Sequence, residues 1–144
     1  MAPNATQLIQ YFLQTVSHDI KHYEQLLDLL KRQRVLYVSF DAVALQENLA
    51  AQQPLLNTLK TSSRQRQDCL KQLGLEDSNR GVSRLQNALP SALKKKAMVQ
   101  WDSLQRLVEQ CQQYNNDNGQ VSASFHEMIS GVIKPAADIY HEQP

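Results

Sequence analysis

The sequence predicts an all-α fold: an antiparallel bundle of three long helices plus one short helix, with coiled-coil-like packing. Glycine (4) and proline (5) are scarce among the 144 residues, and aromatic residues make up only 6%. Apolar residues also recur at alternating spacings of three and four, which keeps one stripe facing neighbouring helices. The length fits one domain. We expect the helical bundle to occupy residues 1–135 and a mobile tail to occupy residues 136–144.

The first helix is expected to begin at Asn4, because Asn4 and Gln7 form a capping-box pattern. Beta-branched and aromatic residues at 35–40, followed by the good N-cap residue Asp41, predict a short turn after this helix. Between these ends runs a heptad seam in which only Arg34 is not apolar. Its members are Ile9, Leu13, Val16, Ile20, Tyr23, Leu27, Leu30, Arg34 and Tyr37.

The second helix repeats this spacing and contains Pro54. Because the apolar phase continues after Pro54, a kink is expected there and not a break. Gly74 should end the helix as the first residue past its C-cap. The predicted seam consists of Leu45, Leu49, Gln52, Leu56, Leu59, Ser63, Arg66, Leu70 and Leu73.

A short helix within residues 82–89 should precede Pro90, and Ser91 is expected to cap the last helix. Residues 115–119 have poor helix propensity and would suit a turn. The heptad phase passes through them unbroken, so one continuous helix ending at Pro135 is predicted. This helix would be longer than its partners, so part of its apolar stripe could extend beyond the bundle. Its seam consists of Leu93, Ala97, Gln100, Leu104, Leu107, Cys111, Tyr114, Asn118, Val121, Phe125, Met128 and Val132.

Charge and hydropathy exclude several classes of partner. Fifteen lysines and arginines against 14 acidic residues leave a formal charge of +1, so no overall field attracts nucleic acid or anionic lipid. The basic run at residues 94–96 is interpreted as a solvated helix face. No stretch approaches the ~20 apolar residues of a membrane span, and residues 1–11 lack the pattern of a signal peptide. We expect a cytoplasmic protein without nucleic-acid partners or membrane insertion.

The sequence patterns of known catalytic and metal sites are missing. There is no glycine-rich phosphate loop, no Gly-x-Ser-x-Gly elbow and no His-Glu-x-x-His. His18 and His22 lie four residues apart beside Asp19, but no further metal ligand can be named, so both are interpreted as surface histidines. Cys69 and Cys111 are interpreted as small hydrophobic residues. We expect no enzyme activity, no cofactor and no metal; a helical metalloenzyme remains a rival that would carry bound metal.

Five seam or near-seam residues have two interpretations each. The polar seam residues Gln52, Arg66, Gln100 and Asn118 either fix the register of the helices or mark places where the seam is open to water, which is the commoner case. Trp101, one residue off the seam, more often pads a helix interface than anchors a partner.

The segment from Trp101 to Gly119 resembles the Asn-x-x-Asn-Gly signature of the FlgN-type flagellar export chaperones. The rest of the chain agrees with that pattern, from the leucine-rich first helix to a short tail carrying Tyr140. Gln120 and Val121 depart from the bulkier apolar pair that often follows the glycine. The residues that carry the resemblance are Trp101, Leu104, Leu107, Cys111, Gln112, Asn115, Asn118 and Gly119.

The resemblance implies a cytoplasmic protein that binds the terminal helices of hook–filament junction proteins, prevents their self-association and delivers them to the flagellar export gate or its ATPase complex. It also implies that Tyr140 contacts the gate; the alternative is an unimportant terminal tyrosine. We expect a monomer or a weak dimer. The competing hypothesis is a structural or regulatory coiled-coil protein that self-associates through its apolar stripe.

A cargo-binding stripe is expected near the end of the last helix, where the apolar face is wider than a bundle seam requires. The alternative is that the same side chains form bundle core. The predicted stripe contains Val121, Phe125, Met128, Ile129, Val132 and Ile133.

Overall fold

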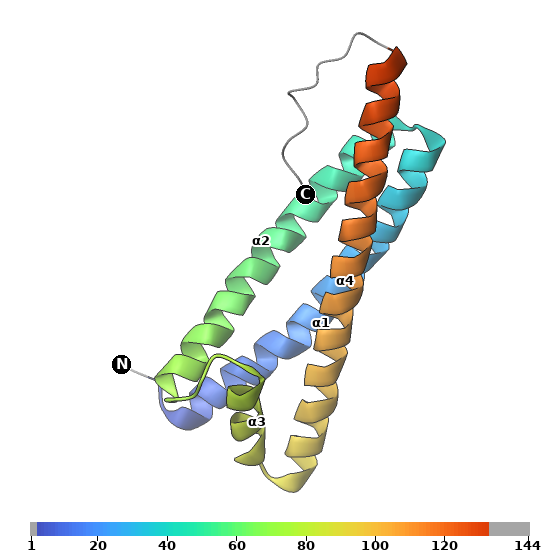
Figure 1. Cartoon of the computed structure of the whole chain (residues 1–144). Coiled ribbons are helices and arrows are strands. Elements are labelled where there is room, and N and C mark those ends of the chain that lie inside the picture. Colours follow the sequence, from blue (N-terminus) through green and yellow to red (C-terminus); the bar gives the residue numbers. More distant parts are fainter. Residues whose placement is uncertain (1–2, 133–144) are drawn as a thin grey trace.

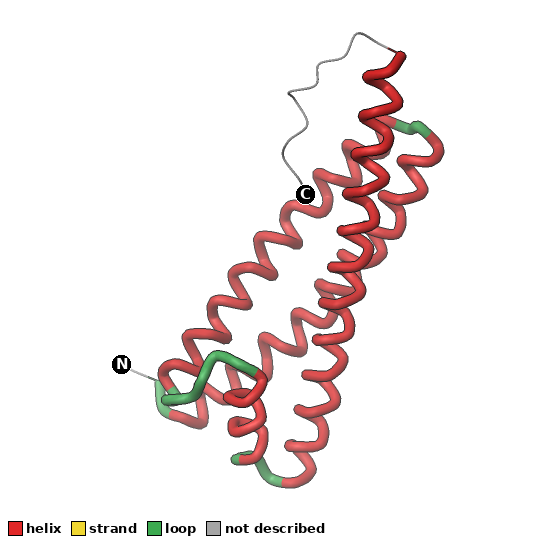
Figure 2. The backbone as a smooth tube through the Cα atoms, in the orientation of Figure 1, coloured by secondary structure: helices red, strands yellow, loops and turns green. Residues whose placement is uncertain are grey.

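The computed structural model describes the backbone of residues 3–132 and the side chains of residues 3–120. Four helices follow one another in this range: α1 (Ala5–Ser39), α2 (Ala42–Gln72), α3 (Asn79–Asn87) and α4 (Ser91–Val132). Figure 2 shows only helices and their connections over the described backbone. The prediction of an all-α chain is therefore confirmed.

Helix α1 is the centre of the fold. It packs along both α2 and α4, whereas α2 and α4 make few contacts with each other (Figure 1). Asp19 of α1 meets Arg66 of α2 while the later Gln33 meets the earlier Gln52, so α1 and α2 are antiparallel, as predicted. Helix α4 runs parallel to α1 instead, because α2 and α3 return the chain to the end where α1 begins.

The ends of α1 and α2 follow the predicted local chemistry. Asn4 and Gln7 form both hydrogen bonds of a capping box, and Asp41 accepts from the backbone N–H of Ala44. Helix α2 runs through Pro54 without a break. Gly74 has a φ of 73° and completes a Schellman motif, with the N–H groups of Gly74 and Leu75 donating to the carbonyls of Lys71 and Leu70.

The connection between α2 and α4 is held by α3. Ser78 caps α3 by accepting from the backbone N–H of Gly81, so this helix begins three residues before the predicted 82. A Cβ on Gly81 would lie 1.7 Å from the carbonyl oxygen of Glu76, so the chain that leads into α3 passes directly over this glycine. Helix α4 begins with Ser91 itself, so the prediction that Ser91 precedes and caps the helix is wrong by one position.

Two apolar clusters form the core along α1. The first joins the start of α1 to the end of α2, to α3 and to the start of α4; its buried members are Leu8, Phe12, Val16, Cys69, Leu70, Val82, Leu85 and Leu104. The second joins the later part of α1 to the middle of α2 and α4; its buried members are Leu26, Leu27, Leu30, Leu59 and Cys111. Tyr23 packs against both clusters, so they form one continuous core.

The predicted seams are partly right for all three long helices; in α4 the first predicted member, Leu93, is exposed, and the seam beyond residue 120 lies outside the described side chains. In α4 the buried side chains are at the predicted positions Ala97, Leu104, Cys111 and Asn118, and the helix is continuous through residues 115–119, as predicted. In α2 the buried face includes Asn48, whereas the predicted core residues Leu49 and Leu56 are exposed.

In α1 the buried face is wider than one heptad stripe, because this helix contacts two long partners. It therefore includes positions that an apolar spacing does not select. The buried residues of α1 are Leu8, Phe12, Thr15, Val16, Asp19, Leu26, Leu27, Leu30, Gln33 and Leu36.

Candidate binding surfaces

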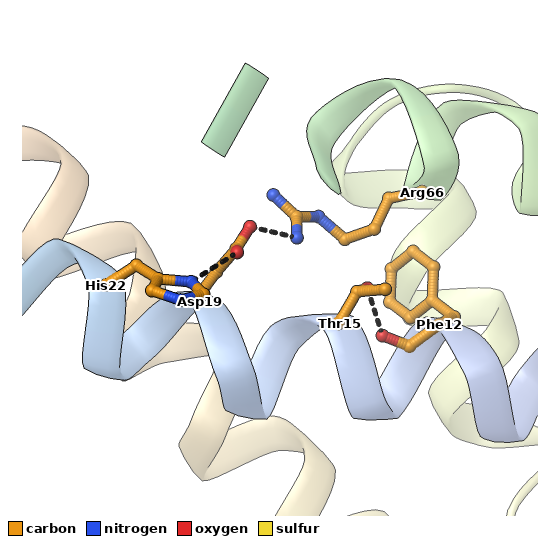
Figure 3. Close-up of polar contacts among 5 residues, drawn as sticks. All are labelled: Phe12, Thr15, Asp19, His22 and Arg66. Carbon is orange, nitrogen blue, oxygen red and sulfur yellow. Dashed lines mark hydrogen bonds and ion pairs between the residues drawn. The ribbon is translucent and has the colours of Figure 1, made fainter. Parts of the chain in front are cut away.

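A buried ion pair joins α1 to α2. Asp19 is completely buried, and the Nη1 atom of Arg66 donates to its Oδ2 oxygen over 2.6 Å (Figure 3). The Nδ1 atom of His22 lies 3.5 Å from the other carboxylate oxygen. Within the described residues no group of three or more His, Cys, Asp or Glu side chains is placed to hold a metal ion. Asp19 therefore serves the pairing of the helices, and Arg66 is a register-fixing residue.

A second polar network links all three long helices. The Oε1 oxygen of Gln33 in α1 accepts from Gln52 of α2 over 2.8 Å and from Asn118 of α4 over 3.4 Å. Asn118 also donates to the backbone carbonyl of Leu30 over 2.9 Å, and Gln52 donates to Asn48 over 2.8 Å. Gln52 and Asn118 are buried, so the interpretation of these two positions as water-exposed parts of the seam is wrong, while the fourth polar seam residue, Gln100, is half-buried.

The other residues of the sequence signature lie at helix interfaces or at a groove edge. Trp101 is half-buried, with its ring centroid 5.9 Å from that of Phe12, and its Nε1 atom donates to the side chain of Asn79 over 3.3 Å. These contacts agree with the interpretation of Trp101 as interface padding. Asn115 and Gly119 are half-buried on α4.

Both thiols and one phenol have raised pKa values. Burial raises the pKa of the Cys111 thiol to about 11, and burial together with the charge of Asp68 raises that of Cys69. Burial and the charge of Asp19 raise the pKa of Tyr23, partly offset by Arg66. Because a thiolate is the reactive form of cysteine, both thiols stay protonated and unreactive at neutral pH. They behave as the small hydrophobic residues that the sequence predicts.

An elongated groove lies between α2 and α4, with α1 as its floor; we call it the α2–α4 groove. Its first part encloses about 510 Å³ and is lined mainly by apolar side chains, with amides at the edge. The lining residues of this part are Tyr23, Leu26, Leu30, Leu49, Gln52, Gln53, Leu56, Val108, Cys111, Gln112 and Asn115. A second hollow shares Tyr23 and Leu56 with the first and follows α2 without reaching α4; its other lining residues are Leu59, Lys60, Ser63, Arg64 and Gln67, and we count it as the second part of the groove.

The apolar spacing of α2 did not predict this groove. Leu49 and Leu56 lie on a heptad with Leu45 and Leu59 and were therefore expected in the core, yet 43% of Leu49 and 44% of Leu56 are exposed. The buried positions of α2 next to α1 are taken instead by the polar residues Asn48 and Gln52. A polar residue can occupy such a position only when it finds a hydrogen-bond partner, which the sequence alone does not show.

Exposed apolar side chains also gather at the turn between α1 and α2. The exposed fractions are 53% for Val35, 72% for Val38, 60% for Phe40 and 70% for Val43, and we call these four residues the apolar tip. Phe40 has a φ of 56°, in the left-handed region that bulky side chains rarely adopt. In Figure 1 the end of α4 passes beyond this turn.

The predicted cargo stripe lies at this same end of the molecule. The backbone of residues 121–132 is the last part of α4, and the parallel pairing of Leu30 with Asn118 brings it alongside the end of α1. The side chains of Val121, Phe125, Met128, Ile129 and Val132, and all of Ile133 and Tyr140, lie outside the described part of the chain.

Comparison with known proteins decides the family. The family model described as FlgN protein matches residues 1–134. The chain belongs to the FlgN family. A crystal structure of a flagella synthesis protein FlgN from Pseudomonas aeruginosa has 26% sequence identity to this FlgN-family chain, covers 92% of it and 98% of its own chain, and superposes with a TM-score of 0.73. No match was found among proteins with curated descriptions.

Family membership makes this FlgN-family protein a flagellar export chaperone in general terms, with flagellar proteins as its partners. The family is one of chaperones and not of enzymes. No helix in the described part of the chain is long and apolar enough to cross a membrane.

Proposed function

We propose that this FlgN-family protein works in the cytoplasm, where it binds the terminal helices of hook–filament junction proteins, prevents their self-association and delivers them to the export gate. The observation that carries the proposal is the apolar tip. Val38 and Val43 expose most of their side chains at the end of the molecule where α4 passes beyond the bundle. Grouped apolar surface of this kind typically marks a protein-binding site.

The physical demands of the task match this surface. A helix that assembles into a filament junction carries an apolar stripe, which would self-associate before export. A chaperone needs only to cover that stripe by helix-against-helix packing, with anchors at spacings of three and four. No nucleotide or metal is required, and release follows from a fast dissociation rate and competition at the gate.

The predicted stripe on α4 would extend the apolar tip. Because α4 runs parallel to α1, residues 121–132 lie at the level of the last turn of α1 and the turn that follows it. We propose that the stripe and the tip together form the cargo surface, with Phe125 and Met128 as its centre. Bundle core remains the alternative for these side chains, and the experiment below separates the two.

Calorimetric titration of the full chain with a terminal helical fragment of a junction protein from the same organism tests this proposal. We expect one-to-one binding with a negative heat-capacity change. Met128→Asp and Val38→Asp should each weaken binding at least about tenfold, because an anchor lost from a buried interface costs more than about 1.4 kcal/mol.

Val99→Asp is the matched control, since Val99 is 63% exposed on α4 but lies near its start, far from the tip. It should bind as the unaltered chain does. Val38 is exposed, so its variant keeps the test valid if Met128→Asp fails to fold. Absence of binding at tens of micromolar, an equal loss in Val99→Asp, or a concentration-dependent dimer without affinity for the fragment would contradict the proposal.

We also propose that Tyr140 contacts the export gate, as the family resemblance implies. A Tyr140→Ala variant should bind the junction fragment as before but lose most of its affinity for the cytoplasmic part of the gate, because one aromatic anchor often dominates a small interface. Surface-immobilised gate protein and the two chaperone variants, each with and without cargo, provide the measurement. Equal loss of both activities would show that Tyr140 does not separate gate docking from cargo binding.

A further inference from the structure

We propose that the α2–α4 groove is a second docking surface, separate from the apolar tip, and that it takes an amphipathic helix of a partner protein that carries acidic side chains. The inference goes beyond the cargo surface proposed above, because the groove lies along the middle of the bundle. It starts from the contact pattern of the fold, in which α1 packs on two long helices that hardly touch each other.

The groove has an apolar centre that folding leaves open. Leu49 and Leu56 stand seven residues apart on the same face of α2 and remain more than 40% exposed, while Val108 on the opposite wall is half-buried. Two leucines at heptad spacing beside an apolar floor are the counterpart of a helix with anchors at spacings of three, four and seven. A partner helix over these two leucines would bury apolar surface that is exposed to water in the isolated chain.

The charge of the groove identifies the kind of helix. Lys60 and Arg64 line it where it passes Tyr23, and the described side chains lining this stretch and the apolar centre include no carboxylate. Neither Lys60 nor Arg64 has an ion pair among the described residues, whereas Arg66 forms an ion pair with Asp19. A partner helix that places glutamates or aspartates beside Lys60 and Arg64 would complement both.

The length of the groove sets the size of that helix. From Leu49 to Arg64, α2 rises about 22 Å at 1.5 Å per residue, so a partner helix of about 15 residues, or four turns, would cover it. A helix also satisfies its own backbone hydrogen bonds, which suits walls that offer side-chain amides and not an open sheet edge. Gln53, Gln112 and Asn115 stand at the edge for polar contacts with it.

Two designed peptides test the proposal against the full chain. Both have about 16 residues and the same leucines at heptad positions, and their polar faces are glutamate-rich in one and lysine-rich in the other. Fluorescence anisotropy of the labelled peptides should show at least about tenfold tighter binding of the glutamate peptide at low salt. Leu56→Asp should abolish this binding, and K60E combined with R64E should reverse the preference.

Val38→Asp is the control, because it alters the apolar tip and leaves the groove intact. It should bind the glutamate peptide normally while it weakens binding of the junction-protein fragment. The groove variants should show the opposite pattern, so the two surfaces can fail independently.

Three results would overturn the proposal. Equal affinities for both peptides would remove the charge argument. A concentration-dependent dimer that Leu56→Asp abolishes would make a second copy of the chain the occupant. About tenfold tighter peptide binding by Tyr140→Ala would show that the chain's own C-terminal residues compete for the groove, in place of an external partner.

Discussion

Replacing Arg66 with methionine is expected to lower the free energy of unfolding by about 3–5 kcal/mol, because it leaves the carboxylate of Asp19 buried without its partner. Asp19 is completely buried and its Oδ2 oxygen lies 2.6 Å from Arg66. The only other ion-pair partner described for it is His22, at 3.5 Å from the second oxygen. Urea unfolding followed by circular dichroism measures the loss.

Arg64→Met is the matched control for this prediction. Arg64 is exposed two residues earlier on the same helix, so its replacement should change stability by no more than about 0.5 kcal/mol. The double variant Asp19→Leu, Arg66→Met should recover much of the loss, because an apolar pair can replace a buried ion pair. A loss below about 1 kcal/mol for Arg66→Met would mean that the carboxylate finds water or another partner.

Replacing Gly81 with alanine is expected to destabilise the protein by about 2–3 kcal/mol. The new Cβ would lie 1.7 Å from the carbonyl oxygen of Glu76, which is backbone and cannot move aside as a flexible side chain would. Either α3 or the segment before it must shift, and overpacking of this kind outweighs the better helix propensity of alanine. Thermal unfolding followed by circular dichroism measures the effect.

Gly74→Ala separates this steric effect from backbone strain. Gly74 has a φ of 73° but no atom within 4 Å of an added Cβ, so the variant should lose only about 1–2 kcal/mol, the cost of a left-handed alanine. If Gly74→Ala destabilised the protein more than Gly81→Ala, the close approach of Glu76 would not be what makes Gly81 necessary.

Local chemistry explains which parts of the fold could be predicted from the sequence. The capping box at Asn4, the restart at Asp41 and the Schellman glycine at position 74 depend on residues within one turn of each other, so the sequence contains the whole interaction. The continuous helix through residues 115–119 was predictable because Asn118 keeps the heptad phase. Its buried Nδ2 atom then donates to the carbonyl of Leu30, while its Oδ1 oxygen has no hydrogen-bond partner among the described residues.

The polar core could not be predicted in the same way. Nothing in the apolar spacing marks Asp19 and Gln33 as buried, because their partners Arg66 and Gln52 lie far along the chain. Heptad spacing predicts an apolar stripe on α4 but not which of the other helices covers it. Sequence spacing also treats every leucine on a stripe alike, so it could not separate buried Leu59 from exposed Leu49 and Leu56.

The candidate surfaces differ in how far the sequence indicated them. The resemblance in residues 101–119 led to the correct family, although Trp101, Asn115 and Gly119 are half-buried and Asn118 is buried, so these four do not form an exposed motif. Three of the four residues of the apolar tip lie in the β-branched and aromatic run before Asp41, which by itself indicates only a turn. Exposure, which decides its meaning, depends on how the helices meet.

Sedimentation velocity of a junction-protein terminal fragment, alone and with an equal amount of this FlgN-family chain, tests the central claim most directly. We expect the fragment alone to form concentration-dependent oligomers, and the chain to convert them into a single one-to-one complex. Oligomers of the fragment that persist unchanged, with the chain sedimenting separately at every concentration, would contradict it.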